Sequence, residues 1–371
     1  MSQASDTAVD TSASDQRERQ NLYAMTEAQL TEALLALKQP KFRAKQVCEW
    51  VYQRGVTSFE EMSNLPKALR QELSARFRFG HLSLVTQQRS QDGTEKRLYE
   101  LPDHKLIESV LMPYSDGRRT ACISSQAGCA MGCSFCATGQ MGFDRHLSPE
   151  EIFEQAQRFS SELQRRGERL SNVVLMGMGE PFHNYDNVIS ALKMIMERLE
   201  IGARRITVST VGLAPKIRRF AEEGLQVKLA ISLHSTRDEE RLAIMPVNKR
   251  YPIAELISAC HDFVRATRRR VTFEWALIQG QNDSTEEAER LASLLKGLLC
   301  HVNVIPLNPT AGYEGAPSDP ERVGRFIETL ERRGVPATVR MRRGIDIDAG
   351  CGQLKSSELL AEEAPLVQLE G

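Results

Sequence analysis

The stretch Cys129-Ala-Met-Gly-Cys133-Ser-Phe-Cys136 places three cysteines within eight residues, at the spacing C-x3-C-x2-C. Three thiolates on one loop can hold three irons of a four-iron cluster and leave the fourth iron without a protein ligand. Zinc is the main alternative, but zinc sites more often use paired C-x2-C elements and a fourth protein ligand. The spacing therefore favours an iron–sulfur cluster with one open iron, which can bind a cofactor or a substrate directly.

Length and composition indicate an ordinary globular protein. The chain has 371 residues, of which 41% are hydrophobic and 26% are charged, enough for a large domain with a smaller one. Eight cysteines without a secretion signal predict a reducing compartment, so we expect a cytoplasmic protein. No apolar run is long enough to span a membrane, so we expect no membrane partner.

Basic pairs and triplets recur along a chain whose net charge is only −1. They are Arg118-Arg119, Arg165-Arg166, Arg204-Arg205, Arg268-Arg269-Arg270, Arg332-Arg333 and Arg342-Arg343. Charge runs usually mark solvated faces, although a local basic surface on a neutral protein can contact phosphates. The composition permits RNA binding without arguing for it.

The N-terminal part of the sequence predicts a tail and a small helical domain. Residues 1–20 are rich in Ser, Thr, Asp and Ala, which is typical of a disordered tail and not of a signal peptide. Helical periodicity over residues 26–38, 43–53 and 66–77 predicts an accessory domain at 21–80. Its mildly basic face is compatible with RNA contact, although helix solubility explains the charges at least as well. The basic residues are Lys41, Arg43, Lys45, Lys67 and Arg70.

The rest of the chain predicts a β connector followed by an α/β barrel. Short apolar or alternating runs separated by turn residues predict a β-hairpin connector over residues 81–118. From 119 to 356, apolar runs alternate with helical patterns, which predicts a parallel sheet closed or partly closed as a barrel. The strands expected after the cysteine loop are 173–176, 205–209, 227–232, 271–276, 302–306 and 337–340. Residues 357–371 are expected to form a C-terminal tail.

Polar residues and glycines stand where the predicted strands end, which is where such barrels place their reacting groups. They are Gly179 and Glu180 in Gly-Met-Gly-Glu-Pro, Ser209, Ser232 and His234 in Ser-Leu-His, and Asn308. Glycine lets the backbone approach a ligand closely, and a glutamate can accept from an ammonium group. A lone histidine such as His234 is ordinarily a residue at the barrel mouth whose hydrogen bonds are made within the protein. Because His234 belongs to a series of polar residues at strand ends, contact with a ligand is at least as well supported.

Two further cysteines and one glutamate stand out. Cys351 lies in a glycine-flanked loop after the last strand, where an exposed thiol tends to be reactive, whereas Cys122, seven residues before the cluster motif, is ambiguous. Glu108 is a single acid in an apolar strand, which indicates either an outward-facing carboxylate or a functional base. The remaining cysteines lie in apolar patterns and are expected in the core: Cys48, Cys260 and Cys300.

With these residues in view, the chain resembles the RlmN/Cfr family of radical S-adenosylmethionine (SAM) RNA methyltransferases, and most of all its RlmN-type adenosine-C2 methylases. C-x3-C-x2-C is the signature of radical SAM enzymes. The matching stretches span roughly residues 27 to 356, and small departures are Gly350, where alanine is expected, and a slightly long loop at 113–119. The stretches are Phe42–Val47, Ser90–Thr94, Ile107–Val110, Cys129–Phe143, Gly177–Pro181, Ser232–His234 and Ala349–Leu354.

The resemblance implies a partial (βα)6 TIM-like radical SAM barrel with one 4Fe–4S cluster and two SAM molecules per turnover. Cys129, Cys133 and Cys136 would ligate the cluster, and its open iron would bind SAM. The residues implied to hold SAM are Gly179, Glu180, Ser209, Ser232, Leu233, His234 and Asn308.

The same resemblance implies the reaction. Cys351 would take a methyl group from one SAM, and a 5′-deoxyadenosyl radical from the second would abstract hydrogen from that methyl. The carbon radical would add to adenine C2, Cys122 would release the product by forming a disulfide with Cys351, and Glu108 would be the proton acceptor. The implied partners are 23S rRNA, tRNA at the adenosine 3′ of the anticodon, and a flavodoxin- or ferredoxin-type reductant. We expect a monomer.

Three alternatives remain open at this point. Cfr-like methylation at adenosine C8 uses the same cysteines, and motifs alone do not separate it from C2 methylation. A radical SAM enzyme acting on a peptide or small molecule would need neither Cys122 nor Cys351. A non-enzymatic iron–sulfur or zinc RNA-binding module would not cleave SAM.

Overall fold

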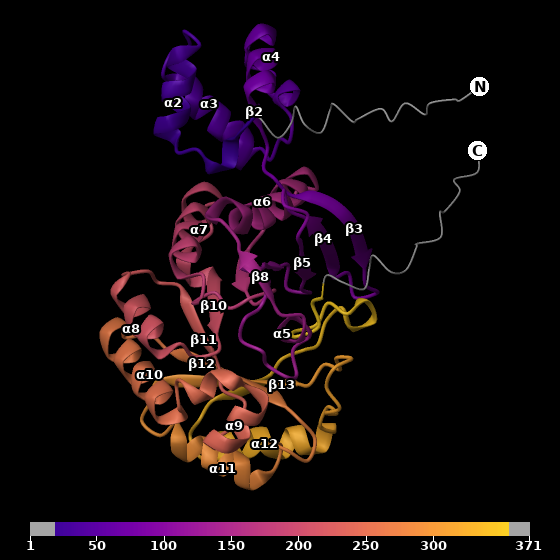
Figure 1. Ribbon diagram of the computed structural model, residues 1–371, viewed down its shortest axis with the longest axis vertical. Helices are drawn as coiled ribbons and strands as arrows, with labels where there is room; N and C mark the ends of the chain where they lie inside the picture. Colours follow the sequence, from indigo (N-terminus) through magenta and orange to yellow (C-terminus); the bar gives the residue numbers. More distant parts are fainter. Residues whose placement is uncertain (1–18, 356–371) are drawn as a thin grey trace, which may run out of the picture. The chain divides into compact units, whose positions relative to one another are not determined.

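The structure, a computed structural model, describes residues 19–355 (Figure 1). The predicted tails at 1–20 and 357–371 lie outside these residues, apart from Arg19 and Gln20. The chain divides into two compact units, Met1–His81 with Ser160–Glu168 and Leu82–Phe159 with Arg169–Gly371. The finer division predicted from the sequence, at residues 20, 80, 118 and 356, stays a prediction. No helix among the described residues is long and apolar enough to cross a membrane.

The first unit contains the three predicted helices. They are α2 (Glu27–Ala36), α3 (Phe42–Cys48) with a π-helical continuation η2 (Glu49–Gln53), and α4 (Lys67–Arg76). Thr26 begins α2 because its hydroxyl accepts from Gln29 N–H while the Gln29 side chain accepts from Thr26 N–H, a reciprocal capping box. Short elements complete the unit: β1 (Gln20–Asn21) pairs in parallel with β2 (Phe77–Arg78), and η1 (Leu22–Ala24) and η3 (Phe59–Glu61) are single 3₁₀ turns.

The second unit is built on a ten-stranded sheet in the order β14-β13-β12-β11-β10-β9-β6-β5-β4-β3. An antiparallel part is formed by β3 (Ser83–Arg89), β4 (Glu95–Glu100) and β5 (Leu106–Pro113), which pairs with β6 (Arg119–Cys122). From β6 onward the pairing is parallel. The parallel strands are β9 (Asn172–Leu175), β10 (Ile206–Thr210), β11 (Lys228–Ser232), β12 (Val271–Leu277), β13 (Cys300–Pro306) and β14 (Ala337–Val339).

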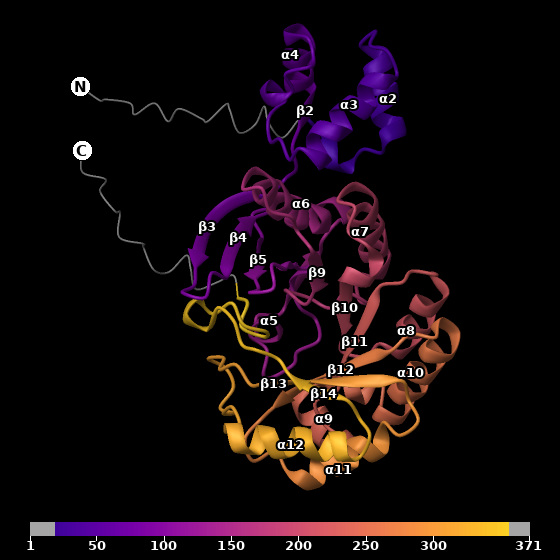
Figure 2. The ribbon, with the colours of Figure 1, turned by 180° about the vertical axis from the view of Figure 1, so that it is seen from behind.

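Helices connect the parallel strands and cover the outer face of the sheet (Figures 1 and 2). They are α6 (Pro149–Arg165), α7 (Tyr185–Arg198), α8 (Ala214–Glu222), α9 (Asp238–Ile244), α10 (Ile253–Thr267), α11 (Thr285–Leu294) and α12 (Pro320–Arg332), with the 3₁₀ turns η4 (Ala203–Arg205), η5 (Pro246–Lys249) and η6 (Ile345–Ile347). Strands buried on both faces carry continuous apolar runs, as Leu229, Ala230 and Ile231 do in β11. The predicted partial barrel is confirmed, whereas α9 was not predicted.

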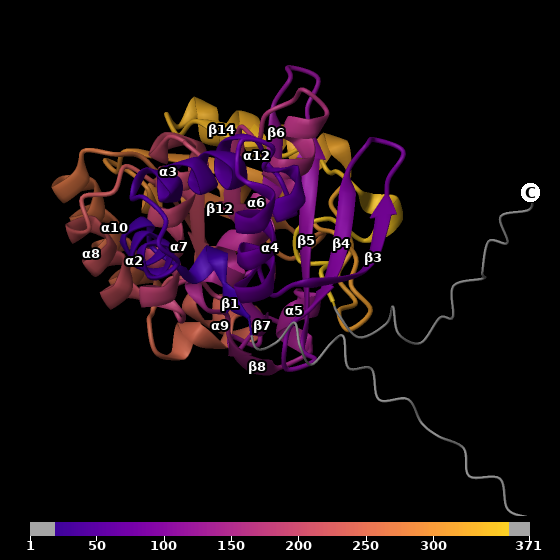
Figure 3. The ribbon, with the colours of Figure 1, turned by 90° about the horizontal axis from the view of Figure 1, so that it is seen from above.

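The sheet does not close into a ring. A closed barrel would pair β14 with β6, but β6 pairs instead with β5, so that β3, β4 and β5 extend the sheet beyond the barrel (Figure 3). The carboxyl ends of β6 and β9 to β14 meet at one edge, because parallel strands share a direction. Most of the candidate site residues predicted from the sequence lie at that edge.

Candidate active site

The cysteine motif lies on a loop closed by a small hairpin that the sequence did not predict. β7 (Gln126–Gly128) pairs with β8 (Phe143–His146), and α5 (Ala137–Gln140) lies between them. Cys129 N–H donates to Gly142 O at 2.6 Å. Gly128 has a φ of 70°, and a Cβ there would lie 2.2 Å from Gly142 O. The hairpin therefore requires glycine at 128.

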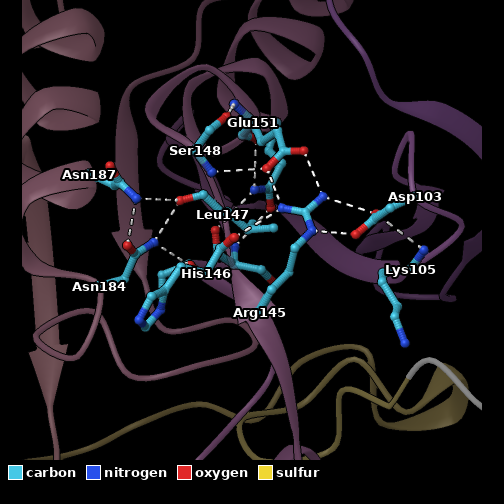
Figure 4. Close-up of polar contacts among 12 residues, drawn as sticks. Asp103, Lys105, Arg145, His146, Leu147, Ser148, Glu151, Asn184 and Asn187 are labelled. Carbon is cyan, nitrogen blue, oxygen red and sulfur yellow. Dashed lines mark hydrogen bonds and ion pairs between the residues drawn. The ribbon is translucent and has the colours of Figure 1, made fainter.

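Arg145 of β8 fixes the end of this loop (Figure 4). Its guanidinium donates to Asp103 on one side, with Nε 2.5 Å from Oδ2, and to Glu151 on the other, with Nη1 2.8 Å from Oε2. Leu147 O accepts from Asn184 Nδ2 at 2.7 Å and from Asn187 Nδ2 at 3.1 Å. These contacts anchor the cysteine loop to α6 and α7.

Cys129, Cys133 and Cys136 are free thiols that lie close enough to influence one another. Burial raises the pKa of Cys129 to about 12, and burial followed by the charges of Cys136 and Cys129 raises the pKa of Cys133. At neutral pH the raised pKa values favour the protonated thiols, so a bound cation is needed to stabilise these cysteines as thiolates. No three His, Cys, Asp or Glu side chains among residues 19–355 are grouped tightly enough for a single ion. A four-iron cluster fits this loop, since each thiolate then binds a different iron.

A cavity opens beside the cysteine loop, at the carboxyl ends of the strands. It measures about 960 Å³, including the part open to solvent. Its lining includes Cys133 and Cys136 and all but one of the predicted SAM residues: Gly179, Glu180, Ser209, Ser232, His234 and Asn308. Leu233 differs, because its side chain is fully buried and its N–H donates to Glu274 O. Asn308 Oδ1 is buried without a hydrogen-bond partner in the described part of the chain, an acceptor free for a ligand.

Glu180 presents a buried carboxylate to this first cavity. Its side chain is 2% exposed, and burial raises its pKa to about 7. Oε1 accepts from Phe182 N–H at 2.9 Å and Oε2 from Val211 N–H at 2.8 Å. Each carboxylate oxygen has a second lone pair. Glu180 is therefore oriented by backbone donors and can still accept from an ammonium group.

His234 is a neutral donor at the same cavity. Its Nδ1 accepts from Ala276 N–H at 2.8 Å, which assigns the proton of the neutral ring to Nε2. Burial, followed by the charge of Arg241, lowers its pKa to about 3. The ring stands edge-on to Phe135, with centroids 4.9 Å apart. The interpretation of His234 as a satisfied residue at the barrel mouth is confirmed for Nδ1, whereas its contact with a ligand stays a prediction.

A second cavity of about 550 Å³ joins the first at Cys351. Cys351, Asn308 and Met176 line both cavities, whereas Cys122 lines only the second. Cys351 is exposed, as predicted, and Cys122 is buried; neither forms a disulfide in this structure. Asn308 Nδ2 donates to Cys351 O at 3.0 Å, and Ala137 N–H donates to Gly352 O at 2.7 Å. The Cys351 loop is thus tied to the cysteine loop.

Arg340 provides a positive charge near both of these thiols. Burial raises the pKa of Cys122 to about 12, and the Arg340 guanidinium opposes that rise. Cys351 is exposed overall, but the protein packed around its sulfur raises its pKa, which Arg340 again opposes. Arg340 Nη1 lies 3.9 Å from Glu274 Oε2, and Asn303 Nδ2 donates to the same oxygen at 2.7 Å. Arg340 is therefore held between a carboxylate and two thiols.

Glu108 points into the protein, so the outward-facing interpretation was wrong. Its side chain is 0% exposed, Lys96 Nζ lies 3.5 Å from Oε1, and Lys355 N–H donates to Oε2 at 2.9 Å. Burial raises its pKa to about 7, and the charge of Lys96 opposes that rise. A carboxyl group titrating near neutral pH can exchange a proton. Glu108 lines neither cavity.

Comparison with known proteins agrees with this geometry. The radical SAM superfamily model matches residues 123–292, and the model of the ribosomal RNA large subunit methyltransferase N-terminal domain matches residues 20–78. A protein of Myxococcus xanthus named a dual-specificity RNA methyltransferase RlmN is 48% identical over 340 residues, covering 91% of this chain and 94% of that one. The chain belongs to the RlmN family.

Two further relatives support this assignment. A Geobacillus kaustophilus protein named a probable dual-specificity RNA methyltransferase RlmN is 45% identical over 342 residues, which cover 91% of this chain and 93% of the relative. The crystal structure of a radical SAM methyltransferase from Sphaerobacter thermophilus superposes with a TM-score of 0.87 at 48% identity, covering 91% of this chain and 99% of the other. As a radical SAM protein, this RlmN family member uses a 4Fe–4S cluster and SAM.

The RlmN fold also depends on a residue that sequence reasoning missed. Arg241 on α9 is fully buried and donates to Leu233 O at 3.0 Å, to Val211 O at 2.6 Å and to Asn248 Oδ1 at 2.8 Å. It joins the loops that follow β10 and β11 beneath the first cavity. The surrounding run Asp-Glu-Glu-Arg is typical of a solvated helix, so the sequence carried no signal of this role.

The other cysteines fulfil the expected structural role in part. Cys260 is 0% exposed and Cys300 is 6% exposed, which confirms their place in the core. Cys48 is only half-buried. None of the three lines either cavity described above.

Proposed function

We propose that this protein methylates C2 of adenosine in 23S rRNA and tRNA, with Cys351 carrying the methyl group as S-methylcysteine. The observation that carries the proposal is the position of Cys351 at the junction of two cavities. One cavity is lined by two of the cluster cysteines, Cys133 and Cys136, and by the strand-end polar residues, and the other is lined by Cys122. A thiol at their junction can accept a group on one side and deliver it on the other. The names of the relatives, dual-specificity RNA methyltransferases, supply the class of substrate.

We infer that Cys129, Cys133 and Cys136 hold the 4Fe–4S cluster and that the first cavity holds SAM. When bound, the cluster and SAM supply a 5′-deoxyadenosyl radical. Glu180 accepts from the ammonium group of SAM through the lone pairs that the backbone leaves free, and His234 donates through Nε2. Gly179 has a φ of 97°, and a Cβ there would lie 2.5 Å from Gln126 Cβ. Glycine at this position therefore lets the loop pack directly against Gln126.

Radical chemistry suits the proposed target atom. C2 of adenine is an electron-poor aromatic carbon without a lone pair, so it cannot attack a methyl donor as an amine does. Cys351 attacks the methyl of the first SAM, breaks its C–S bond and releases S-adenosylhomocysteine. Hydrogen abstraction from the S-methyl group then gives a carbon radical that adds to C2. The loop contacts from Asn308 and Ala137 hold Cys351 in position for both steps.

Cys122 and Glu108 complete the proposed reaction. The adduct at C2 would lose one electron to the oxidised cluster as C2 loses its proton, which restores the aromatic ring. The Cys122 thiolate then attacks the Cys351 sulfur and forms a disulfide, and the carbon released from sulfur takes a proton from solvent to become the methyl group. Glu108 takes the proton lost from C2, consistent with a pKa raised to about 7. Because Glu108 lines neither cavity, its access to the base requires either a bridging water or movement of the segment at Lys355, whose N–H donates to it.

We also propose the broader setting of the reaction. A flavodoxin- or ferredoxin-type protein donates the electron, the enzyme works as a monomer, and its RNA substrates place the activity in the cytoplasm. The helical region at 21–80 contacts RNA, in line with the match of residues 20–78 to the N-terminal domain of ribosomal RNA methyltransferases. The regions at 81–118 and 119–356 serve as the connector and the catalytic barrel.

Nucleoside analysis tests the proposal most directly. Reconstituted, reduced protein is incubated with SAM and with unmodified rRNA or tRNA in separate reactions, and the digested nucleosides are analysed by mass spectrometry and chromatography. We expect 2-methyladenosine from both RNAs, and none from a Cys351→Ala variant that still cleaves SAM. Formation of 8-methyladenosine alone would replace C2 by C8 as the target. Methyl transfer to RNA that persists in Cys351→Ala would refute the S-methylcysteine route.

A further inference from the structure

The amino ends of the parallel strands carry a row of basic side chains. Arg204 and Arg205 precede β10, Lys228 begins β11, and Arg269 and Arg270 precede β12. The register places these strand ends side by side, since Thr207 pairs with Lys228 and Leu229 pairs with Val271 (Figure 1). The basic pairs that recur along the sequence thus gather at one edge of the barrel.

Arg118, which precedes β6, belongs to the same surface. Partial burial, followed by the charges of Arg270, Arg269, Arg118 and Arg205, lowers the pKa of Lys228. We call this surface the basic edge, composed of Arg118, Arg204, Arg205, Lys228, Arg269 and Arg270. Neighbouring strands are about 4.8 Å apart, so the strand ends from β6 to β12 extend over roughly 19 Å.

The charge of the basic edge is mostly unbalanced. Arg118 Nε is 2.8 Å from Asp116 Oδ2, and Arg204 Nε donates to the neutral Gln226 amide at 3.0 Å. Within residues 19–355, the other four members have no carboxylate at ion-pair distance. All members are exposed except Arg269, which is half-buried. On a chain of net charge −1, such a concentration of cations is a surface for a polyanion.

One member of the basic edge, Arg118, contacts a residue that lines the second cavity. Tyr114 lines that cavity, and the guanidinium carbons of Arg118 and Arg343 lie 4.6 and 4.4 Å from the centre of its ring. The cavity itself is bounded on one side by β5 and β6 and on the other by the segment after β14, where the sheet fails to close. The opening therefore leads from Cys122 and Cys351 toward the basic edge.

We propose that the basic edge binds the phosphate backbone of the RNA substrate beside the nucleotide that enters the second cavity. This inference rests on the proposed function and extends it to the docking of the RNA. Arginine side chains bind phosphate oxygens strongly, and an RNA chain presents its phosphates in a row that matches a line of cations. The target base leaves its stack to enter the opening while the flanking backbone stays on the edge.

An acidic reductant is the other polyanion that such a surface can attract. The basic edge lies at the amino ends of the strands, whereas the cysteine loop follows the carboxyl end of β6. The five residues of β10 alone separate the two ends by roughly 17 Å. Electron transfer falls steeply with distance, so a reductant is better placed near the cysteine loop. RNA does not need its whole length near the cysteine loop, because a long chain can contact the basic edge with one part and reach the second cavity with another.

The test compares two double variants of the basic edge with a matched double variant elsewhere. Arg204→Gln with Arg205→Gln and Arg269→Gln with Arg270→Gln are measured beside Arg237→Gln with Arg325→Gln, which removes the same charge from α9 and α12. Binding of unmodified tRNA is followed by fluorescence anisotropy over a range of salt concentrations. Each phosphate that the protein no longer neutralises lowers the slope of log affinity against log salt by about one unit. We expect a smaller slope and about tenfold weaker binding for each edge variant, and wild-type values for the control.

Kinetics provide the second readout. For the edge variants, KM for tRNA rises while kcat changes little, because none of the four replaced arginines lines either cavity. Wild-type slope and affinity in both edge variants would overturn the inference. So would slower reduction by flavodoxin with unchanged RNA binding, which would make the edge a protein-docking surface. If wild-type protein binds tRNA through this edge but forms no methyladenosine, the proposed function is refuted while the inference about RNA docking stands.

Discussion

Replacement of Arg241 by methionine tests how the structure holds the SAM cavity. Arg241 is the hydrogen-bond donor of Val211 O, at 2.6 Å, and of Asn248 Oδ1, at 2.8 Å. Leaving a buried acceptor unsatisfied costs about 1–3 kcal/mol, so the two together cost roughly 2–6 kcal/mol. Release of a buried guanidinium and access of water offset part of this cost. We expect a loss of about 3 kcal/mol in the free energy of unfolding, which corresponds to a fall in Tm of roughly 6–12 °C.

The same substitution is expected to weaken SAM binding. Val211 supplies both the carbonyl that Arg241 holds and the N–H that donates to Glu180, so a displaced Val211 disturbs the carboxylate in the cavity. A tenfold rise in the dissociation constant, about 1.4 kcal/mol, is the expected size. Urea denaturation and calorimetric titration with SAM measure the two effects.

Arg237→Met, at the N-cap position that precedes the same helix, is the matched control. The Arg237 side chain is 48% exposed and pairs with Glu240 at 2.7 Å, and such surface pairs contribute at most about 1 kcal/mol. We expect this variant to keep its SAM affinity. An unfolding free energy for Arg241→Met within about 1 kcal/mol of wild type, or equal losses in both variants, would refute the role given to Arg241.

Three other predictions concern protonation, the cysteine loop and RNA binding. The pKa of Glu108 is raised from 4.5 to about 7, so between these pH values the folded protein holds a proton that the unfolded chain releases. Stability therefore falls as pH rises through this range, by up to about 3 kcal/mol from this group. Glu180 contributes a similar loss in both proteins, so urea denaturation at pH 5 and pH 8 should show a smaller loss in Glu108→Gln than in wild type, and equal losses would contradict the buried, protonated Glu108. Gly128→Ala places a Cβ 2.2 Å from Gly142 O, whereas a Cβ at Gly132, which also has a positive φ, has its nearest atom 3.8 Å away. After reconstitution, the iron content of Gly128→Ala should therefore fall well below that of Gly132→Ala. Equal iron contents in the two variants would contradict the requirement for glycine in the hairpin. Replacing the exposed Lys41, Lys45 and Lys67 with glutamine should reduce the salt slope of tRNA binding by about one unit for each phosphate that is no longer bound, and an unchanged slope would remove the helical unit from the RNA-binding surface.

Much of the site could be predicted because parallel strands obey a simple rule of direction. Their carboxyl ends meet at one edge, so residues that follow different strands, such as Glu180, His234 and Asn308, converge even though they are far apart in the sequence. The glycines and polar residues at those points needed no knowledge of side-chain packing. Their shared cavity follows from strand order and strand length alone.

Buried charges were the part that could not be predicted. Glu108 was ambiguous because its direction depends on which face of β5 meets Lys96 and the chain near Lys355. The role of Arg241 was missed because the sequence pattern of an arginine next to acidic residues does not distinguish an exposed side chain from one buried below a cavity. Arg340 gained its place only through contacts with Glu274 and the two thiols. Such positions are decided by tertiary contacts, which no local pattern records.

The failure of β14 to pair with β6 has a consequence for polymers as substrates. A closed ring of strands admits only what can be passed through its mouth, which suits a free small molecule or the end of a chain. A ring with a gap along its side can take a unit from the middle of a chain, because the chain on either side never has to be threaded. An adenosine far from either terminus of its RNA can then reach Cys351 by a sideways step of a single nucleotide.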